Sequence, residues 1–498
     1  MTGFSRTRDI LLREVLGRIQ NKLQEVGRLQ PGVQKRTIIS SAMEKDKGRD
    51  RRQKTKELIL DSTKHVANVV TPPVCKGMTT LLRSAFDKNF EIPTVTLGSE
   101  NWSTAFTILK PYLLKIRNLK PVRVSEDGKT KYVYLNPALL KGTSADEFLE
   151  LLRSQSDTGE VFQSISVESV CFSYDNWSHD QVLDSVLPDD IEKLSSYSKV
   201  GHLIHLNLRD HLLPYKDIIG QILLDKIPST KTVVNKLNTI DNTFRNFQME
   251  VIAGENDTVV TVKHAKCEFQ FDFAHVYWNP RLGTEHERIH CLLERGDVLY
   301  DVFAGVGPFA VPAGKQKVQV LANDLNPKSF EWLQLNIKKN KVSDYVKAYN
   351  LDGRDFITTV VQQDLVARLE SGQISQPFHV VMNLPAIAVE FLDAFWNILH
   401  GKEVDDLNIL VHVYCFVKGA ENYKKEALEL VKDQLGFQLE EDEVNEVAFV
   451  RNVAPNKEML RVSFKLPKIV LTSPKPVNDG PSPKKRKVSE VTEDESSV

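Results

Sequence analysis

The sequence has few cysteines, no long apolar run and no internal repeat. Its five cysteines among 498 residues include no CxxC pair, which argues against a disulfide framework and against a zinc site built mainly on cysteine. No segment approaches the roughly 20 consecutive apolar residues of a membrane-spanning helix. These absences indicate a globular chain of a reducing compartment, with no membrane partner.

The sequence also lacks an excess of charge of either sign. Its 65 basic and 66 acidic side chains give a net charge of −1, so composition alone does not indicate a nucleic-acid partner. Hydrophobic residues make up 41% and charged residues 26%, which excludes a collagen-like or fully disordered chain. The length favours about two to four domains.

The two ends differ from the middle. Residues 8–26 place apolar side chains on one helical face within an Arg-rich segment, a pattern typical of mitochondrial targeting and also of a plain solvated helix. Residues 35–64 hold ten basic and five acidic side chains and predict a mobile arm. The tail contains the basic run 483–488, which favours a nuclear import signal or a nonspecific phosphate contact.

The middle of the chain predicts α/β structure. Residues 198–275 are strand-rich, and the alternation over 268–273 predicts a strand with one buried face of Phe side chains. From 297 onward strands and helices alternate, which is typical of a parallel sheet. Strands over 444–451 and 458–466 form a closing hairpin that is typical of methyltransferases.

A glycine-rich turn follows the predicted strand 298–303. Gly305 and Gly307 would let the backbone approach a nucleoside cofactor, and Asp324 at the end of the next strand could accept both hydroxyls of a ribose. Ordinary β–α turns and a nicotinamide site are the alternatives to S-adenosylmethionine here. Asp301 suits a cationic amino-acid group, and Pro308 removes a backbone N–H that a pyrophosphate would use.

Three further positions fit S-adenosylmethionine and a planar base. Asp352 and Gly353 end a third strand-like segment, where the acid could meet the adenine edge. Asn383, two residues before Pro385, ends the strand 378–382 and offers an acceptor to a base nitrogen. We therefore predict S-adenosylmethionine as the cofactor.

A candidate base lies just upstream of the glycine turn. Thr284 and Glu287 have the spacing of a capping box, which would put Glu285 at the first helical position. The helix dipole there favours the ionised carboxylate that a general base needs. A surface Glu that complements the dipole is the alternative.

Several ordered motifs together carry a family resemblance. The segments 277–286, 301–309, 323–327 and 383–385 resemble the tRNA (guanine-37-N1)-methyltransferase family of the archaeal and eukaryotic type. The likeness covers 190–467 closely and 70–190 loosely. It implies an α/β class I methyltransferase fold, a Rossmann-like sheet with a closing hairpin, preceded by a smaller α/β domain and a small N-terminal domain.

The resemblance also implies how the chain divides. The expected parts are an arm (1–68), a domain that binds the tRNA body (69–190), an α/β RNA-binding domain (191–275), the methyltransferase domain (276–467) and a disordered tail (468–498). A monomer is expected. The two ends resemble targeting signals for different compartments, so we expect the protein in the mitochondrial matrix, the nucleus and the cytoplasm.

The resemblance assigns site residues by position. The expected reaction is methyl transfer to N1 of guanine 37, which needs a base for the N1 proton and a cation at O6. The catalytic group would be Glu285 as base, Arg245 at O6, and Tyr277, Asn383 and Pro385 around the flipped base. The cofactor group would be His286, Asp301, Gly305, Gly307, Asp324, Leu325, Asp352, Gly353 and Asn383. No metal is expected.

Three other functions stay open at this point. A related tRNA enzyme transfers the aminocarboxypropyl arm of the same cofactor onto a modified guanine. A noncatalytic RNA-binding module could keep the fold, although the retained Glu285 and Arg245 argue against decay. A nicotinamide oxidoreductase is disfavoured by Pro308 and the closing hairpin.

Overall fold

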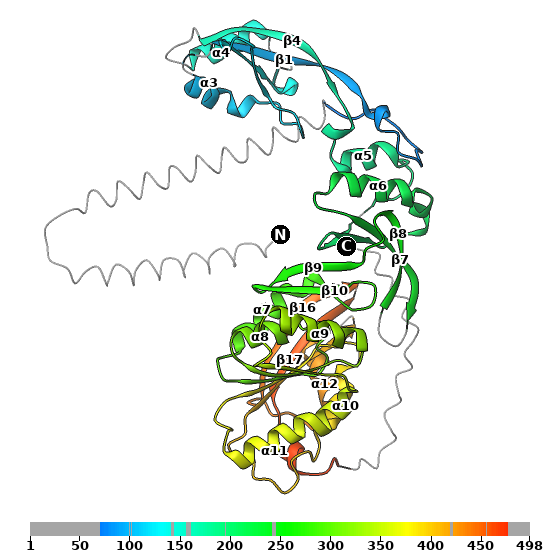
Figure 1. Ribbon diagram of the computed structural model, residues 1–498, viewed down its shortest axis with the longest axis vertical. Coiled ribbons are helices and arrows are strands. Elements are labelled where there is room, and N and C mark those ends of the chain that lie inside the picture. The colour runs from blue at the N-terminus through cyan, green and yellow to red at the C-terminus, as the bar shows by residue number, and fades with distance from the viewer. Residues whose placement is uncertain are drawn as a thin grey trace, which may run out of the picture. The chain divides into compact units, whose positions relative to one another are not determined.

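The computed structural model describes residues 70–98, 100, 102–140, 144–155, 161–194, 196–241, 246–418, 422–454 and 456–476. The predictions for the arm, for the targeting segment 8–26 and for the basic run 483–488 lie outside these residues. The described residues fall into two units, one made of 70–71 and 88–172 and the other of 72–87 and 173–476 (Figure 1).

The first unit is an antiparallel sheet with two helices. Its strand order is β2-β3-β1-β4. The elements are β1 (Lys88–Gly98), α3 (Trp102–Leu109), β2 (Val122–Val124), β3 (Thr130–Tyr134), α4 (Ala145–Ser154) and β4 (Phe162–Phe172). α4 begins at a capping box in which Ser144 and Glu147 bond each other's backbone N–H groups. The buried side chains of the sheet and both helices, such as Val95, Leu109 and Phe148, form its core.

The second unit begins with a small mixed sheet of order β5-β6-β7-β8. Its elements are α5 (His179–Val186), β5 (Ser198–Val200), β6 (Leu203–Leu206), α6 (Lys216–Lys226), β7 (Thr232–Asp241) and β8 (Asn246–Gly254). α6 packs on β7 and β8, and α5 packs on α6. The Trp177 indole also donates to the Phe86 carbonyl at 3.0 Å. The packing of α5 on α6 joins 173–190 to the following sheet, whereas the predicted division is at 190.

A hairpin of β9 (Val259–His264) and β10 (Cys267–Asp272) follows. Phe269 and Phe271 on β10 are buried, as the alternation predicted. The β10 amides of Glu268 and Gln270 donate at 3.0 and 2.8 Å to Asn340, which caps the C-terminus of the helix α9 (Pro327–Lys339), and to Asn336 within that helix. The hairpin therefore packs with the large sheet that follows, and its Phe269 and Phe271 side chains also share a core cluster with Val200 and Leu203 of the small sheet.

The large sheet has the order β13-β12-β11-β14-β15-β17-β16. Its strands are β11 (Val298–Asp301), β12 (Gln319–Asn323), β13 (Val346–Tyr349), β14 (Phe378–Met382), β15 (Ile409–Lys418), β16 (Val444–Ala454) and β17 (Lys457–Lys465). Neighbouring strands from β13 to β15 are parallel, and β17 pairs antiparallel with β15. This order with a reversed closing hairpin confirms the predicted class I methyltransferase fold.

Helices cover both faces of this sheet. They are α7 (Gly283–Leu292), α8 (Ala310–Lys315), α9, α10 (Gly353–Asp355), α11 (Gln362–Ser371), α12 (Tyr423–Leu435) and α13 (Lys468–Thr472). Leu299 and Tyr300 of β11 belong to the cores on opposite faces, as expected of a parallel sheet covered on both sides. Among the described residues no helix is both long and apolar enough to span a membrane.

The start of the tail differs from the prediction. Residues expected to be disordered from 468 form α13, and its Val470 and Leu471 side chains are buried. The apolar run is too short to show a helical period, so composition alone pointed to disorder.

Candidate active site

The carboxyl ends of three parallel strands bring the predicted polar residues to one edge of the sheet. β11 ends at Asp301, β12 is followed by Asp324, and β14 is followed by Asn383. Because β11 lies between β12 and β14, these ends are neighbours. Ligands of open α/β sheets bind at this edge.

The glycine loop shapes a cradle above that edge. Gly305 and Gly307 have φ of +55° and +96°, values that side chains rarely adopt. A Cβ at Gly307 would meet the Leu333 Cδ1 atom at 2.7 Å and the Val311 Cγ2 atom at 2.8 Å, whereas a Cβ at Gly305 would meet nothing within 4 Å. Gly307 therefore allows close packing, and Gly305 keeps open space where a ligand can approach the backbone.

Asp324 is fixed beside this loop. Its carboxylate accepts hydrogen bonds from the Gly305 amide at 2.7 Å and the Asn326 amide at 2.9 Å. Burial raises the pKa of Asp324 to about 6, although these amides lower it. The Asn350 side chain holds the Asp324 and Leu325 carbonyls, at 2.7 and 3.0 Å. The loop therefore presents an acceptor, as the ribose assignment requires.

Asp301 is a buried carboxylate for which the described part of the chain provides no counter-charge. It is 0% exposed, and neither oxygen accepts a hydrogen bond of normal geometry, although the Phe303 amide favours its charged form. Burial, followed by repulsion from Asp324, raises its pKa well above the ordinary value. A buried acid without a donor is costly, so the site suits a positively charged ligand group. The cationic amino-acid and sulfonium groups of S-adenosylmethionine fit this requirement.

Asp352 and Gly353 lie beyond β13, the next strand along the same edge. The Asp352 side chain caps α10 by accepting from the Arg354 amide at 2.8 Å. A Cβ at Gly353 would meet the Phe303 ring at 3.0 Å and the Phe391 ring at 3.1 Å. Because Gly353 has no side chain, the Phe303 and Phe391 rings can both pack against its backbone. The motif alone did not indicate this structural role.

Glu285 lies inside the protein, and its helix starts earlier than predicted. α7 begins at Gly283 after a 3-10 turn, Pro280–Leu282, in which the Asn279 side chain accepts from the Arg281 amide. The predicted capping box is therefore wrong, and Glu285 stands at the third helical position. Its side chain is 2% exposed, so it is not a surface carboxylate.

Three side chains donate to the Glu285 carboxylate. Oε1 accepts from the Tyr414 hydroxyl at 2.9 Å and from Arg461 Nε at 2.7 Å. Oε2 accepts from an Arg288 guanidinium nitrogen at 3.1 Å. Two of these donors, Tyr414 and Arg461, did not figure in the sequence prediction. The one available signal was an arginine inside the apolar run 459–464, where a strand interior predicts burial.

Tyr414 connects the base candidate to the cofactor cradle. Burial, and then the charge of Glu285, raises the pKa of Tyr414 well above its ordinary value, and Asp301 acts in the same direction. The Tyr414 ring centroid lies 6.4 Å from that of Phe309, on the glycine loop, and Phe309 lies 4.7 Å from His286. Glu285, His286 and the cradle are thus brought together by shared neighbours.

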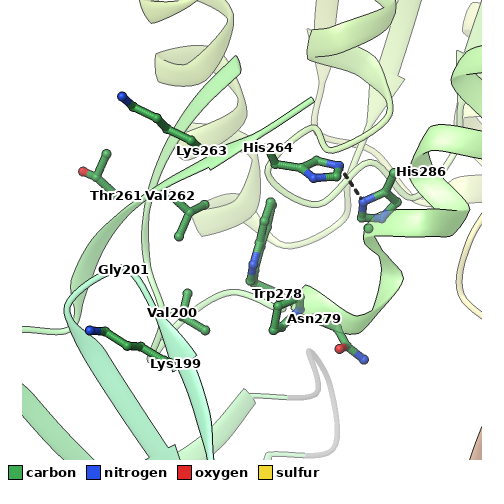
Figure 2. A pocket seen from close by; sticks show the side chains of 12 residues that line it. Lys199, Val200, Gly201, Thr261, Val262, Lys263, His264, Trp278, Asn279 and His286 are labelled. Carbon is green, nitrogen blue, oxygen red and sulfur yellow. Dashed lines mark hydrogen bonds between the residues drawn. The ribbon is translucent and has the colours of Figure 1, made fainter. Parts of the chain in front are cut away.

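His286 is a neutral buried side chain. Its Nδ1 lies 3.1 Å from Nε2 of His264, and burial lowers the pKa of His286 to about 3. Figure 2 shows this pair at one end of a pocket of about 370 Å³, with Trp278 beside it. A neutral imidazole can line a cofactor site as a hydrogen-bond donor or acceptor without adding charge.

The residues predicted to hold the flipped base are exposed or half-buried. Tyr277 is 51% exposed, and its hydroxyl accepts from the Asn279 side chain at 3.2 Å. Asn383 and Pro385 are half-buried, and the Pro385 carbonyl accepts from the Phe416 amide at 3.1 Å. Arg245 lies outside the described residues.

Two family models match adjoining parts of the chain. The model described as the TRM5/TYW2 methyltransferase domain matches residues 259–438, and the one described as the TYW2 N-terminal domain matches residues 179–258. The first match begins at β9. The first description names two kinds of enzyme, so these matches do not separate them.

Relatives that match over most of their length do separate the two kinds of enzyme. The chain is 46% identical over 415 residues to a tRNA (guanine(37)-N(1))-methyltransferase of Drosophila pseudoobscura pseudoobscura, covering 82% of this chain and 93% of the relative. It is 47% identical over 418 residues to the Drosophila melanogaster protein of the same name, covering 83% and 90%. Among solved structures, the complex of aTrm5 and tRNALeu covers 75% of this chain and 99% of that chain, at 24% identity and a TM-score of 0.53. That likeness shows the fold alone.

Proposed function

The chain belongs to the tRNA (guanine(37)-N(1))-methyltransferase family, and from this premise we propose which of its residues carry out the reaction. It transfers a methyl group from S-adenosylmethionine to N1 of guanine 37 in tRNA. The observation that carries the assignment is the buried Glu285 carboxylate, which accepts from the Tyr414 hydroxyl at 2.9 Å, and the charge of the buried Asp301 also acts on that hydroxyl.

The cradle would hold the cofactor through opposite charge and hydroxyl binding. When bound, S-adenosylmethionine supplies an electrophilic methyl group on its sulfonium. Asp324 would accept the ribose hydroxyls, and Asp301 would face the positive charge of the cofactor. Leu325, which is 49% exposed, would cover the adenine. His286, Asp352 and Gly353 would complete the pocket.

Glu285 would act as the general base. Guanine N1 holds a proton at neutral pH, so it becomes a nucleophile only when a base removes that proton. The N1 proton would move to Glu285, the N1 lone pair would form the bond to the methyl carbon, and the carbon–sulfur electrons would remain on sulfur. Arg245 would stabilise the charge that develops on guanine O6.

Exposed and half-buried residues would hold the extruded guanine. A base must leave its stack before a buried carboxylate can reach its Watson–Crick edge. Tyr277 offers an exposed ring for stacking, and Asn383 offers an amide to the base edge. Pro385, fixed through its carbonyl by Phe416, would hold that loop in place. Positioning of this kind supplies a large part of catalysis in an in-line transfer.

Transfer of the aminocarboxypropyl arm is the second candidate, because one matching family model names both kinds of enzyme. The test uses an unmodified tRNA transcript with guanine 37 and cofactor labelled either on the methyl group or on the arm. We expect methyl label in 1-methylguanosine, and no label in a matched transcript with adenine 37. Label from the arm without methyl label would support the second candidate and contradict the first.

We further propose that the chain is shared among mitochondria, nucleus and cytoplasm. The support is its sequence: the Arg-rich amphipathic segment 8–26 and the basic run 483–488. A fluorescent fusion of the full chain should lose mitochondrial signal when Arg8, Arg13 and Arg18 are changed to Glu. It should lose nuclear signal when Lys484 and Lys485 are changed to Ala. Unchanged distributions would contradict the respective address.

A further inference from the structure

The two oxygens of Glu285 are held differently. We propose that Tyr414 and Arg461 are positioning residues that fix Oε1, and that Oε2 is therefore the atom that accepts the guanine proton. This inference rests on the proposed role of Glu285 as the base. It assigns the roles of two residues and of one oxygen atom within that site.

The donors to Oε1 lie on two neighbouring interior strands of the large sheet. Tyr414 on β15 and Arg461 on β17 are directly paired across the two strands. Both side chains are buried, and their bonds to Oε1 measure 2.9 and 2.7 Å. Two charge-assisted bonds from one cross-strand pair leave this oxygen little freedom to move.

Arg461 is itself held on its remaining nitrogens. Its two terminal nitrogens donate to the Ser463 hydroxyl at 2.5 Å and to a Glu446 oxygen at 2.8 Å. Ser463 in turn lies 2.8 Å from Nδ1 of the buried His412. Because each end of the guanidinium has a partner, Arg461 cannot turn away from Glu285 without breaking several bonds.

Oε2 is held less firmly than Oε1. Its donor among the described residues is Arg288, whose side chain is 47% exposed, at 3.1 Å. The same Arg288 nitrogen also donates to the Phe449 carbonyl at 3.1 Å. Arg288 and Arg461 line a pocket of about 660 Å³ beside α7. An exposed side chain next to open space can withdraw when substrate arrives, which frees Oε2 for the proton.

The groups around Glu285 determine how the reaction rate depends on pH. Arg288 faces it from α7, Tyr414 from β15 and Arg461 from β17. Behind these donors lie Glu446 on β16, which bonds Arg461, and Asp301 on β11, near Tyr414. Removing a donor to the charged carboxylate favours its protonated, inactive form, so the acid limb of the rate profile moves to higher pH.

The test measures kcat and kcat/KM against pH for three enzymes. In Tyr414→Phe the acid limb of both profiles should move up by about one pH unit, while tRNA and cofactor binding stay unchanged. In Arg288→Gln the acid limb of kcat/KM alone should move, because kcat/KM reports the free enzyme and kcat the complex from which the arginine has withdrawn. A kcat limb that moves equally in Arg288→Gln would contradict the assignment of Oε2.

The same domain offers a matched control. Tyr300 donates its hydroxyl to an Asp364 oxygen at 2.7 Å, and Arg368 Nε donates to the same oxygen at 2.7 Å, which reproduces the Tyr414–Arg461 arrangement at a different carboxylate. Tyr300→Phe should lose a similar amount of thermal stability and leave both profiles in place. If Tyr414→Phe behaves in the same way, Tyr414 has only a structural role and the proposal fails.

Two more variants keep the outcomes separate. Arg461→Lys retains the charge and loses the forked geometry, so kcat should fall about tenfold with little change in KM. This variant tests the positioning role even if Tyr414→Phe does not fold. Wild-type kcat in Arg461→Lys would overturn the role of Arg461. Glu285→Gln tests the premise: if it keeps wild-type turnover, the proposed function fails. If it is inactive while the Tyr414→Phe profile stays in place, only the positioning proposal fails.

Discussion

Glu285→Gln is expected to lower kcat by about 10²–10⁴-fold, the usual contribution of a general base. Glutamine has nearly the same shape and can still accept from Tyr414 and Arg461, which bond the carboxylate at 2.9 and 2.7 Å. It cannot accept the N1 proton. Affinities for tRNA and cofactor should therefore stay near wild type, measured by calorimetry and by tRNA binding, while turnover is measured at saturation.

Glutamine is a better choice than alanine because of what surrounds the carboxylate. Arg461 is 2% exposed, and alanine at 285 would leave its charge with one partner fewer in the interior. Breaking a buried pair in this way costs about 3–5 kcal/mol of stability and would confuse a lost fold with lost chemistry. Glu287→Gln, an exposed glutamate two residues further along α7, is the matched control and should keep normal turnover. A Glu285→Gln enzyme with at least a tenth of wild-type kcat would contradict the role.

Asp301→Asn is expected to weaken cofactor binding by about 100-fold and to stabilise the free protein at neutral pH. Among the described residues, no donor reaches this fully buried carboxylate with normal hydrogen-bond geometry, so a bound cation would offset the cost of burying its charge. Asparagine removes the negative charge that would face the cofactor. It also removes the cost of burying that charge beside Asp324.

The pH dependence of this effect has a definite sign. Burial raises the pKa of folded Asp301 well above 3.8, so the folded state binds this proton more tightly than the unfolded state. The resulting stability is complete below pH 3.8 and is lost as pH rises toward the folded pKa. Thermal unfolding should therefore show a larger gain for Asp301→Asn at pH 8 than at pH 5.

The cofactor measurement completes this second prediction. Calorimetric titration with S-adenosylmethionine should show the 100-fold loss for Asp301→Asn, about 2.7 kcal/mol of binding free energy. Asp355→Asn, which changes an exposed acid of the same domain, should change neither affinity nor stability. Normal cofactor affinity in Asp301→Asn would show that this carboxylate does not face the bound cation.

Local patterns predicted the cofactor edge of the sheet well. The strand before the glycine loop, the loop glycines with positive φ, and the helix that Asn326 caps all follow from short segments of sequence. Each depends on neighbours within a few residues, such as the Asn326 side chain that accepts from the Lys328 amide at 3.0 Å. The alternating Phe positions of β10 were predicted for the same reason, since a strand has a period of two.

The surroundings of Glu285 could not be predicted in this way. Its donors Tyr414 and Arg461 are 129 and 176 residues away along the chain, and they meet it only because β15 and β17 pair in the folded sheet. The capping box failed because the turn at Pro280–Leu282 starts the helix earlier, so Thr284 already lies within it. Pairing register and helix phase are properties of the fold, and short motifs do not contain them.

The most direct test of Glu285 as the base is the pH dependence of a single methyl transfer to guanine 37 by the wild-type enzyme and by Glu285→Gln. The wild-type rate should rise with pH along an acid limb and then level off once the carboxylate is ionised. The variant should have a much lower rate without that limb, because glutamine does not titrate. An acid limb that persists at the same pH in the variant would show that another group takes the proton.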